Sequence, residues 1–273
     1  MGWRAYPADM TNVGDLIAAF DEWFPPELAE DWDAVGLLTG RRTAPVSAAA
    51  LAVELTDATL AWAIDEGAQV LFVHHPLYLR GTSNVDGDSP RGGLVQRAIE
   101  AGLAIFVAHT NADHARPGVS DALAEAVGLI ETRPIRRHIT DPHVGTGRYG
   151  SLEAPTTLAE FVGRVAWALP KTHSGVRWAG EPDRRIVRVA VCAGAGADLL
   201  DEIEADVFVT SDLRHHAALD YLASQRASLI DIPHAAAEWL WLAPLAQRLQ
   251  ARYANLSTVV CPLVTDPWSG HHP

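Results

Sequence analysis

Hydrophobic residues along this chain fall into two patterns that alternate. Val70–Val73 and Ala104–Ala108 are short runs in which every residue is apolar, as in strands buried on both faces of a parallel sheet. Around such runs, apolar residues recur at helical spacing and glycine often follows, as at Gly67 after Asp57–Glu66. The alternation predicts an α/β fold with mostly parallel, helix-flanked sheets.

The same patterns set the expected elements. Helices are expected at residues 12–24, 57–66, 94–101, 119–127, 158–168, 198–204, 217–223 and 235–252. Strands are expected at residues 48–55, 70–73, 104–108, 186–192, 207–210, 228–232 and 257–262, and 31–40 is a turn that runs into a short strand. Residues 131–150 are polar, rich in Arg, Pro and Gly, and predict an irregular crossing into a second unit.

Charge narrows the classes of partner. The chain has 21 Lys and Arg against 34 Asp and Glu, a formal net charge of −13 with neutral histidines. A nucleic acid or an anionic membrane needs a basic face, so neither partner is expected. Divalent cations need anionic ligands, and the acidic composition suits them.

No segment predicts export or membrane insertion. Residues 1–10 have no apolar core behind Arg4, and no run of about 18 apolar residues occurs, so we expect a cytoplasmic protein. Cys192 and Cys261 lie far apart in apolar runs and are expected to be core residues rather than a disulfide or a zinc site. The final His271 and His272 lie in a Pro- and Gly-bearing tail that is expected to be disordered surface.

The chain has 12 histidines, and their clustering is unusual. His74 and His75 directly follow the apolar run at 70–73 and precede Pro76. Functional groups of parallel sheets gather at the carboxyl ends of strands, and proline favours a chain that leaves the strand there. The pair is either part of a site or two unrelated surface histidines.

A second polar group follows the run at 104–108. Asp113 can be a metal carboxylate, and His109 can be an outer partner of a ligand or a proton carrier. Asp and Asn are also ordinary turn residues after a strand. This motif alone therefore leaves both interpretations open.

His234 and Glu238 stand four residues apart at the start of the last predicted helix. That spacing puts both side chains on one face, about one turn apart. They could share one metal ion, with one neutral and one anionic ligand. An H-x₃-E pair is common by chance, so its weight depends on the other motifs.

Two turns in the second half have weaker signals. Thr210–Asp212 follow a strand and precede His215-His216; they could line a pocket or cap a helix. Gly194–Gly196 has the order strand, Gly-x-Gly, helix, but lacks the remaining residues of a phosphate-binding loop, so a tight turn is expected. No G-x-S-x-G motif occurs, which argues against a serine hydrolase.

Taken together, the motifs resemble the NIF-three-like family, also called the GTP cyclohydrolase I type 2 homologs. The matching blocks are DWDAVGLLTG (31–40), VLFVHHPLYLRG (70–81), VAHTNADHARPGVSDALAEAVGL (107–129), GTGRYGSLEAPTTLAEF (145–161), and DVFVTSDLRHHAALD with LIDIPHAAAE (206–238). They cover nearly the whole chain. Two positions depart from the family pattern, because Pro233 and Ser211 stand where the family usually has glycine. Neither change removes a presumed ligand.

The resemblance implies a two-metal centre whose ligands would be His74, His75, Asp113, His234 and Glu238. It also implies two interlocked α/β units that assemble into a toroidal homohexamer, with metal sites facing an internal cavity. Some members carry a domain inserted between the halves, and residues 128–145 are too few to hold one. We predict a first unit over 1–128 that regains 232–273, and a second unit over 129–231.

Imidazole and carboxylate ligands suit Zn²⁺, Fe²⁺ or Mn²⁺ better than Mg²⁺ or Ca²⁺, without choosing among the first three. Two such ions would bind a bridging water and lower its pKa, producing a hydroxide nucleophile. We therefore predict a metal-dependent hydrolase of a small polar substrate, a nucleotide ring or a phosphoester, with His109, His114 or His215 as candidate proton carriers. The alternative is a non-catalytic protein that stores metal or docks partners.

Overall fold

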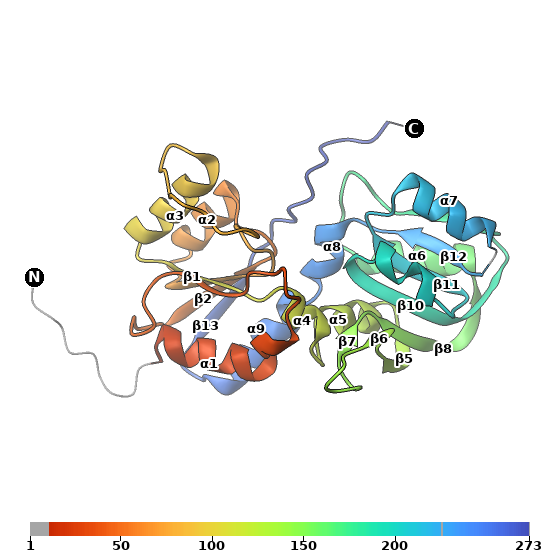
Figure 1. Cartoon of the computed structure of the whole chain (residues 1–273), viewed down its shortest axis with the longest axis horizontal. Helices are drawn as coiled ribbons and strands as arrows, with labels where there is room; N and C mark the ends of the chain where they lie inside the picture. Colours follow the sequence, from red (N-terminus) through yellow and green to blue (C-terminus); the bar gives the residue numbers. More distant parts are fainter. Residues whose placement is uncertain (1–10, 225, 273) are drawn as a thin grey trace, which may run out of the picture. The chain divides into compact units, whose positions relative to one another are not determined.

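The computed structural model describes residues 11–224 and 226–272 (Figure 1). Residues 1–10, which entered the prediction about export, lie outside the described residues. The chain divides into two compact units. Unit 1 runs to Ala112 and regains Leu242–Leu263, and unit 2 comprises Asp113–Trp241 and the tail from Val264.

This division differs from the predicted one at two helices. Helices α5 (Val119–Ala126) and α8 (His234–Trp239) belong to unit 2. Both pack against strand β10 (Arg185–Ala195), and this packing, rather than their position next to unit 1 in the sequence, decides their unit. The chain returns to unit 1 at Leu242–Leu263.

Unit 1 is built on a five-stranded sheet. Its order is β1 (Gly36–Thr39), β4 (Ala104–Val107), β3 (Val70–Val73), β2 (Ala48–Ala52) and β13 (Ser257–Val260). The last four are parallel to one another, and only β1 runs antiparallel to its neighbour. Because Val73 pairs with Val107, the chain leaves β3 and β4 at the same edge of the sheet.

Helices cover both faces of this sheet (Figure 1). Helices α2 (Asp57–Asp65) and α3 (Pro90–Glu100) lie on one face, while α1 (Val13–Trp23) and α9 (Leu242–Arg252) lie on the other; a 3-10 turn, Pro26–Leu28, follows α1. Capping boxes at Asn12 and Thr56 begin α1 and α2. The predicted helix-flanked, mostly parallel sheet is confirmed for this unit.

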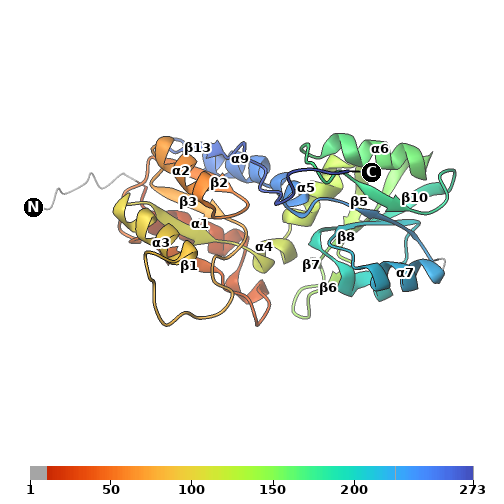
Figure 2. The ribbon, with the colours of Figure 1, turned by 90° about the horizontal axis from the view of Figure 1, so that it is seen from above.

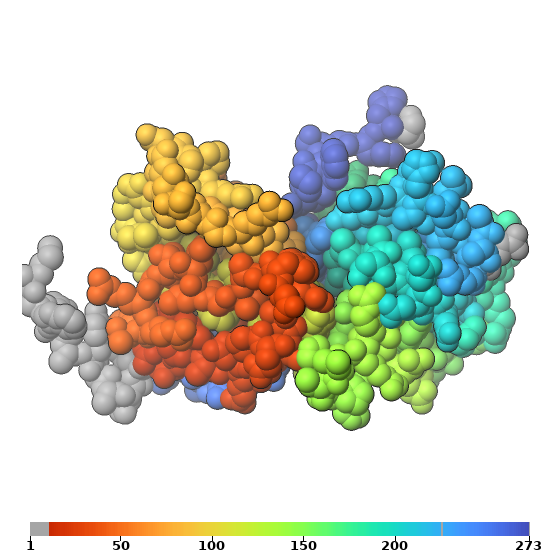
Figure 3. Space-filling view, viewed as in Figure 1, coloured from red at the N-terminus to blue at the C-terminus, as the bar shows by residue number. Residues whose placement is uncertain are grey.

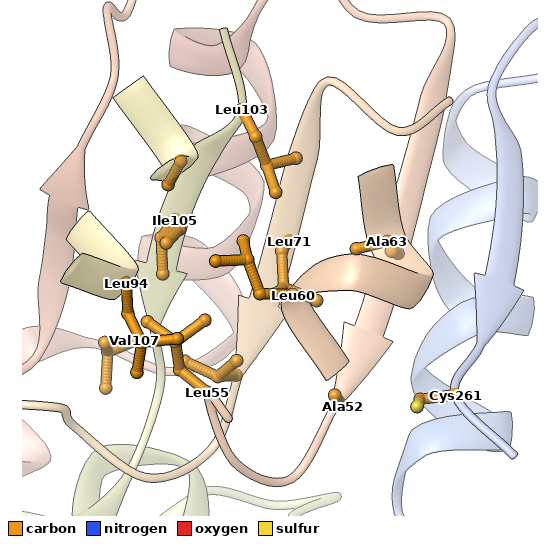
Figure 4. Packing of buried hydrophobic residues seen from close by; sticks show 13 residues of the cluster. Ala52, Leu55, Leu60, Ala63, Leu71, Leu94, Leu103, Ile105, Val107 and Cys261 are labelled. Carbon is orange, nitrogen blue, oxygen red and sulfur yellow. The ribbon is translucent and has the colours of Figure 1, made fainter. Parts of the chain in front are cut away.

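The core of unit 1 explains why the apolar runs form strands. Figure 4 shows Leu60 of α2 and Leu94 of α3 among Leu71, Ile105 and Val107 of the sheet, all buried. On the other face, the ring of Phe20 in α1 stacks on Phe72 at 4.0 Å between centroids. Truncating such a residue, for example Leu60→Ala, removes buried contacts at a cost of about 2–5 kcal/mol.

Unit 2 has a six-stranded, mixed sheet. Its order is β5 (Leu129–Arg133), β8 (Arg148–Thr157), β10, β11 (Val207–Ser211), β12 (Ser228–Asp231) and β9 (Arg177–Ala179). Only β10, β11 and β12 are parallel. Helix α6 (Leu158–Ala168) and helix α7 (His215–Ala223) lie on opposite faces of this sheet (Figure 2). The 3-10 helix η2 (Ala197–Glu202) shares its core cluster with α7.

The predicted irregular crossing at 131–150 contains strands instead. It includes most of β5, the start of β8, and a hairpin of β6 (Arg136–Arg137) and β7 (Gly145–Thr146), whose loop is exposed (light green in Figure 3). Arg148 is completely buried in β8, where its guanidinium donates to both carboxylate oxygens of Asp121 at 2.7 and 2.6 Å and to three main-chain carbonyls. In a sequence, an arginine indicates an exposed position, because buried arginines whose hydrogen bonds are all made are rare. The pattern therefore did not predict the start of β8.

The single helix predicted over 235–252 is also two helices, α8 and α9. Pro244 lies in the first turn of α9, where its missing N–H costs nothing, whereas inside a continuous helix it would remove a hydrogen bond. Cys192 and Cys261 are buried core residues, as predicted, and burial raises the pKa of both thiols. His271 and His272 are exposed. Among the helices of the described residues, none has the length and hydrophobicity needed to cross a bilayer.

Candidate metal centre

Unit 1 brings three histidines together where β3 and β4 end. His74 and His75 follow β3, and His109 follows β4. A candidate ligand atom from each of the three lies within 4.8 Å of the others, and the ring centroids are 4.9, 5.1 and 5.3 Å apart. His74 is fully buried, and the other two are partly exposed. We call these residues the histidine set.

The turn expected after β3 is what lets two consecutive residues share this site. The main-chain N–H groups of His74 and His75 both donate to the carbonyl of Val53, each at 3.0 Å. In a regular strand, consecutive side chains point to opposite faces. Because the chain leaves the strand at His74, both rings reach the same place.

Each ring of the histidine set is oriented through its Nδ1 atom. The three contacts are His74 Nδ1 with Ala108 O at 2.8 Å, His75 Nδ1 with Glu54 Oε1 at 3.1 Å, and His109 Nδ1 with Asp33 Oδ1 at 2.8 Å. A carbonyl or carboxylate oxygen accepts a hydrogen bond from Nδ1–H, which keeps the proton on Nδ1 and the ring's lone pair on Nε2. Metal-ligating histidines are held in this way, with an oxygen acceptor behind the ring.

Asp33 is the most firmly held of these acceptors. Its side chain is buried and also accepts hydrogen bonds from the main-chain N–H of Thr110, at 3.0 Å, and from the Thr110 hydroxyl. Burial by itself would raise the pKa of Asp33, but the hydrogen bonds from His109 and Thr110 outweigh it and hold the pKa below its usual range. Asp33 is therefore an anion that orients His109.

In unit 2, the i, i+4 spacing of His234 and Glu238 brings their side chains into contact, as the sequence predicted. His234 Nε2 lies 2.8 Å from Glu238 Oε1, and we call these two residues the His–Glu pair. Two donor atoms that hold one ion at about 2.0–2.2 Å lie roughly 3 Å apart, so this separation fits a shared metal. Glu238 is only 2% exposed, which excludes a purely solvent-facing role at the helix start.

Two turns of unit 2 support the His–Glu pair. Asp212 Oδ2 lies 2.6 Å from His234 Nδ1, so this ring too has an oxygen behind it. Asp212 adopts φ +58°, a conformation that aspartate tolerates better than most residues. The capping interpretation of Ser211 and Asp212 does not hold, because the N-cap of α7 is Arg214 and has no side-chain cap.

Gly194 makes room for the pair. It has φ +77°, and a Cβ atom there would lie 2.7 Å from Glu238 Oε1 and 3.4 Å from His234 Nε2. The Thr210 hydroxyl donates to the Gly194 carbonyl at 3.0 Å and holds the turn. Gly194 lies inside β10, where the register with β11 shifts, so the expected tight turn is instead an irregularity near the end of a strand, and two candidate ligands take the space that the glycine leaves.

The remaining candidates also lie in unit 2. Burial is the main cause of the raised pKa of the Cys192 thiol, and the charges of Asp113, Asp198 and Glu238 add to it. His114 is buried, and its Nε2 lies 3.0 Å from the Thr146 hydroxyl. His215 lines a separate cavity of about 390 Å³ between α7 and the sheet edge.

Sequence reasoning missed two of the residues that orient the histidine set, Asp33 and Glu54. Asp33 lies 76 positions before His109, and Glu54 lies 21 before His75. Glu54 follows a short apolar segment, as the histidines do, whereas Asp33 precedes one. That signal does not say which histidine each carboxylate meets.

Comparison with known proteins assigns the family. Residues 11–267 match the family model of Duf34/NIF3 (NGG1p interacting factor 3). A Streptomyces coelicolor protein named GTP cyclohydrolase 1 type 2 homolog is 41% identical over 271 residues, covering 96% of this chain and 95% of that protein. A Mycobacterium tuberculosis protein of the same name is 32% identical over 371 residues, covering 96% and 97%. Since this chain has 273 residues, the second relative contains segments that it lacks.

Solved structures agree on the fold. The structure of a Bacillus cereus protein related to NIF3 has a TM-score of 0.88 at 22% identity, covering 96% of this chain and 99% of that one. A Staphylococcus aureus hypothetical protein has a TM-score of 0.86 at 26% identity with the same coverage. The resemblance seen in the sequence motifs is thus confirmed over nearly the whole chain, and this protein belongs to the Duf34/NIF3 family.

Proposed function

We propose that this protein binds divalent transition-metal ions through the histidine set of unit 1 and the His–Glu pair of unit 2, and uses them to hydrolyse a small polar substrate. Asp113 is proposed as a further carboxylate ligand. The observation that carries the proposal is common to both units. All four histidines have an oxygen acceptor at Nδ1, which directs Nε2 toward a ligand.

The donor types support a transition metal. Imidazole nitrogens combined with the carboxylates of Asp113 and Glu238 suit Zn²⁺, Fe²⁺ or Mn²⁺, and we propose two ions per chain. A metal held there would supply Lewis acidity and a nucleophile for hydrolysis at neutral pH. The chain's own contribution is to orient the rings, through Asp33, Glu54 and Asp212, and to hold the buried side chain of Glu238 beside His234.

His109 could be a metal ligand or a proton carrier, and the variant His109→Asn distinguishes the two roles. It lies with His74 and His75, as a ligand would, and its contact with Asp33 is also suited to a proton carrier. His109→Asn keeps a polar side chain but cannot carry a proton. Unchanged metal content with lost turnover would identify a proton carrier, and loss of metal would identify a ligand.

The test of the proposal starts from metal content. The chain is purified without added metal, its metals are measured by elemental analysis, and hydrolysis is screened with the metal found. Nucleotides come first, because relatives are named GTP cyclohydrolase 1 type 2 homolog. We expect about two ions per chain and turnover that a chelator abolishes. A chain without metal would contradict the proposal, and bound metal with no turnover across the panel would favour a non-catalytic role in metal storage or docking.

From the family resemblance we also propose that the two metal ions form one dinuclear centre and that the chains assemble into an oligomer. Metal stoichiometry and the metal–metal distance from X-ray absorption test the first. For the second, we propose a homohexamer. Light scattering that gives a monomer mass at micromolar concentration would contradict it.

A further inference from the structure

One tryptophan of unit 1 stands at the rim of the histidine set. Trp32 is 57% exposed, and its ring meets the ring of His109 edge to face, at 5.9 Å between centroids and 76° between planes. Trp23 in the same unit is different. It is 8% exposed, packs edge to face on Phe24 and carries the guanidinium of Arg248 over its ring at 4.3 Å. Trp23 is a packing residue, whereas more than half of the Trp32 side chain lies outside the core.

The turn that carries Trp32 is tied to the segment that carries His109. The ties are Asp33 N–H to Glu30 O at 2.9 Å, Glu30 N–H to Thr110 Oγ1 at 3.0 Å, Thr110 N–H to Asp33 Oδ2 at 3.0 Å, and His109 Nδ1 with Asp33 Oδ1 at 2.8 Å. Hydrogen bonds on both sides of Trp32 therefore end on Thr110 or His109. The indole therefore lies beside His109 on a turn that hydrogen bonds connect to the segment after β4.

A fixed, exposed indole is suited to stacking. Tryptophan has few rotatable bonds, so it loses little conformational entropy when a ligand covers it. Its ring stacks on planar heterocycles, at roughly 1–3 kcal/mol per ring in nucleic-acid recognition.

We propose that Trp32 is the stacking platform for the substrate, and that the substrate is a planar heterocycle with a polar group that reaches the histidine set. This inference rests on the proposed function, whose substrate class it narrows. Trp32 acts as a specificity residue, because it selects for the ring and takes no part in the chemistry at the histidines.

The experiment compares two ligands that differ in the ring. The full-length, metal-loaded chain is titrated by calorimetry with GMP and with ribose 5-phosphate, and the ligand is checked for integrity afterwards. We expect GMP to bind at least about tenfold more tightly in the wild type, and Trp32→Ala to remove that preference. Trp32→Phe should keep most of it. Trp167→Ala, at a site on α6 that is 83% exposed, is the matched control and should change nothing.

Two results would overturn the inference: equal affinity for GMP in Trp32→Ala and wild type, or no preference for the ring in the wild type. Light scattering on the same samples adds a third, since a changed mass in Trp32→Ala with an intact ring preference would make Trp32 an assembly contact. Bound metal is measured in parallel. A wild type without metal refutes the proposed function, whereas a ring preference that depends on Trp32 in that sample still supports the stacking platform.

Discussion

The histidine set of unit 1 and the His–Glu pair of unit 2 present candidate ligands in different ways. His74, His75 and His109 follow the ends of two adjacent parallel strands, and the strand register together with the turn after β3 brings them together. His234 and Glu238 stand on a short helix, where helical spacing makes the pair. The pair needs something the histidine set does not, which is a nearby main chain without a side chain at Gly194.

This difference sets what each site tolerates. In the histidine set, the carboxylates of Glu54 and Asp33 lie behind the rings of His75 and His109. The His–Glu pair places a buried carboxylate directly beside an imidazole. Unit 1 should therefore be sensitive mainly to which side chains are present, and unit 2 also to charge and to the backbone of a neighbouring turn.

The largest expected effect is the loss of a ring from the histidine set. His75→Ala should lower metal affinity by more than about 100-fold, because removing a ligand costs more than the 10–100-fold typical of an outer partner. Elemental analysis and competition with a chromophoric chelator measure it. His143→Ala, in the exposed loop 138–144, is the control. Equal affinity in both variants would remove His75 from the site.

In unit 2, Glu238→Gln keeps the shape of the side chain and removes its charge. Metal affinity should fall at least about tenfold, or 1.4 kcal/mol, because an amide is a weak donor to a dication. Glu125→Gln, at an exposed position of α5, controls for the general loss of a charge. If Glu238→Gln binds metal with the affinity and stoichiometry of the Glu125→Gln control, Glu238 is not a ligand.

The carboxylates behind the rings allow a direct contrast between the units. Glu54→Gln should lower metal affinity about tenfold by weakening the orientation of His75. Asp212→Asn should have a smaller effect, because the Asp212 side chain is 59% exposed against 25% for Glu54, and solvent screens its interaction with His234. Competition titrations on the two variants decide the order, and the reverse order would contradict this reasoning.

Two glycine variants distinguish the effect of backbone strain from the effect of steric contact with Glu238. Gly194→Ala and Gly175→Ala both place a Cβ at positive φ, at +77° and +63°, and each should lower the free energy of unfolding by about 1–2 kcal/mol. At Gly175 nothing lies within 4 Å of the new Cβ, whereas at Gly194 it meets Glu238. Only Gly194→Ala should therefore lose metal affinity, by a few-fold. A matching loss in Gly175→Ala would assign the effect to strain.

The smallest expected effect concerns a carboxylate of unit 2 that supports the fold alone. Asp206 accepts hydrogen bonds from the main-chain N–H groups of Val187 and Arg188, at 3.0 and 2.8 Å. Burial by itself would raise the pKa of Asp206, but these hydrogen bonds outweigh it and lower the pKa. Asp206→Asn should therefore cost about 1 kcal/mol of unfolding free energy at pH 7 and leave metal content unchanged.

The pH dependence follows from the sign of that shift. The contribution of Asp206 is fully present above its unfolded pKa of about 3.9 and is lost as the pH falls through the lower folded value. Denaturant unfolding of wild type and Asp206→Asn from pH 7 to pH 3 should show the difference shrinking toward zero at the acid end. A difference that grows on acidification would contradict this account.

The local sequence pattern by itself determined the features that depend on residues close together in the chain. The apolar runs at 70–73 and 104–108 became buried parallel strands. The polar residues that follow each run were therefore expected at the carboxyl edge of a sheet, and His74, His75 and His109 lie together there. The contact between His234 and Glu238 follows in the same way, because helical geometry needs only their spacing.

Tertiary structure decided the features that depend on residues far apart in the chain. The partners Asp33 and Glu54 come from segments 76 and 21 positions away from their histidines, and no local periodicity links them. Strand β8 forms although Arg148 lies in it, because Asp121 and three carbonyls satisfy the guanidinium. Helices α5 and α8 belong to unit 2 because they pack on β10, and such packing reflects complementary surfaces rather than the order of residues.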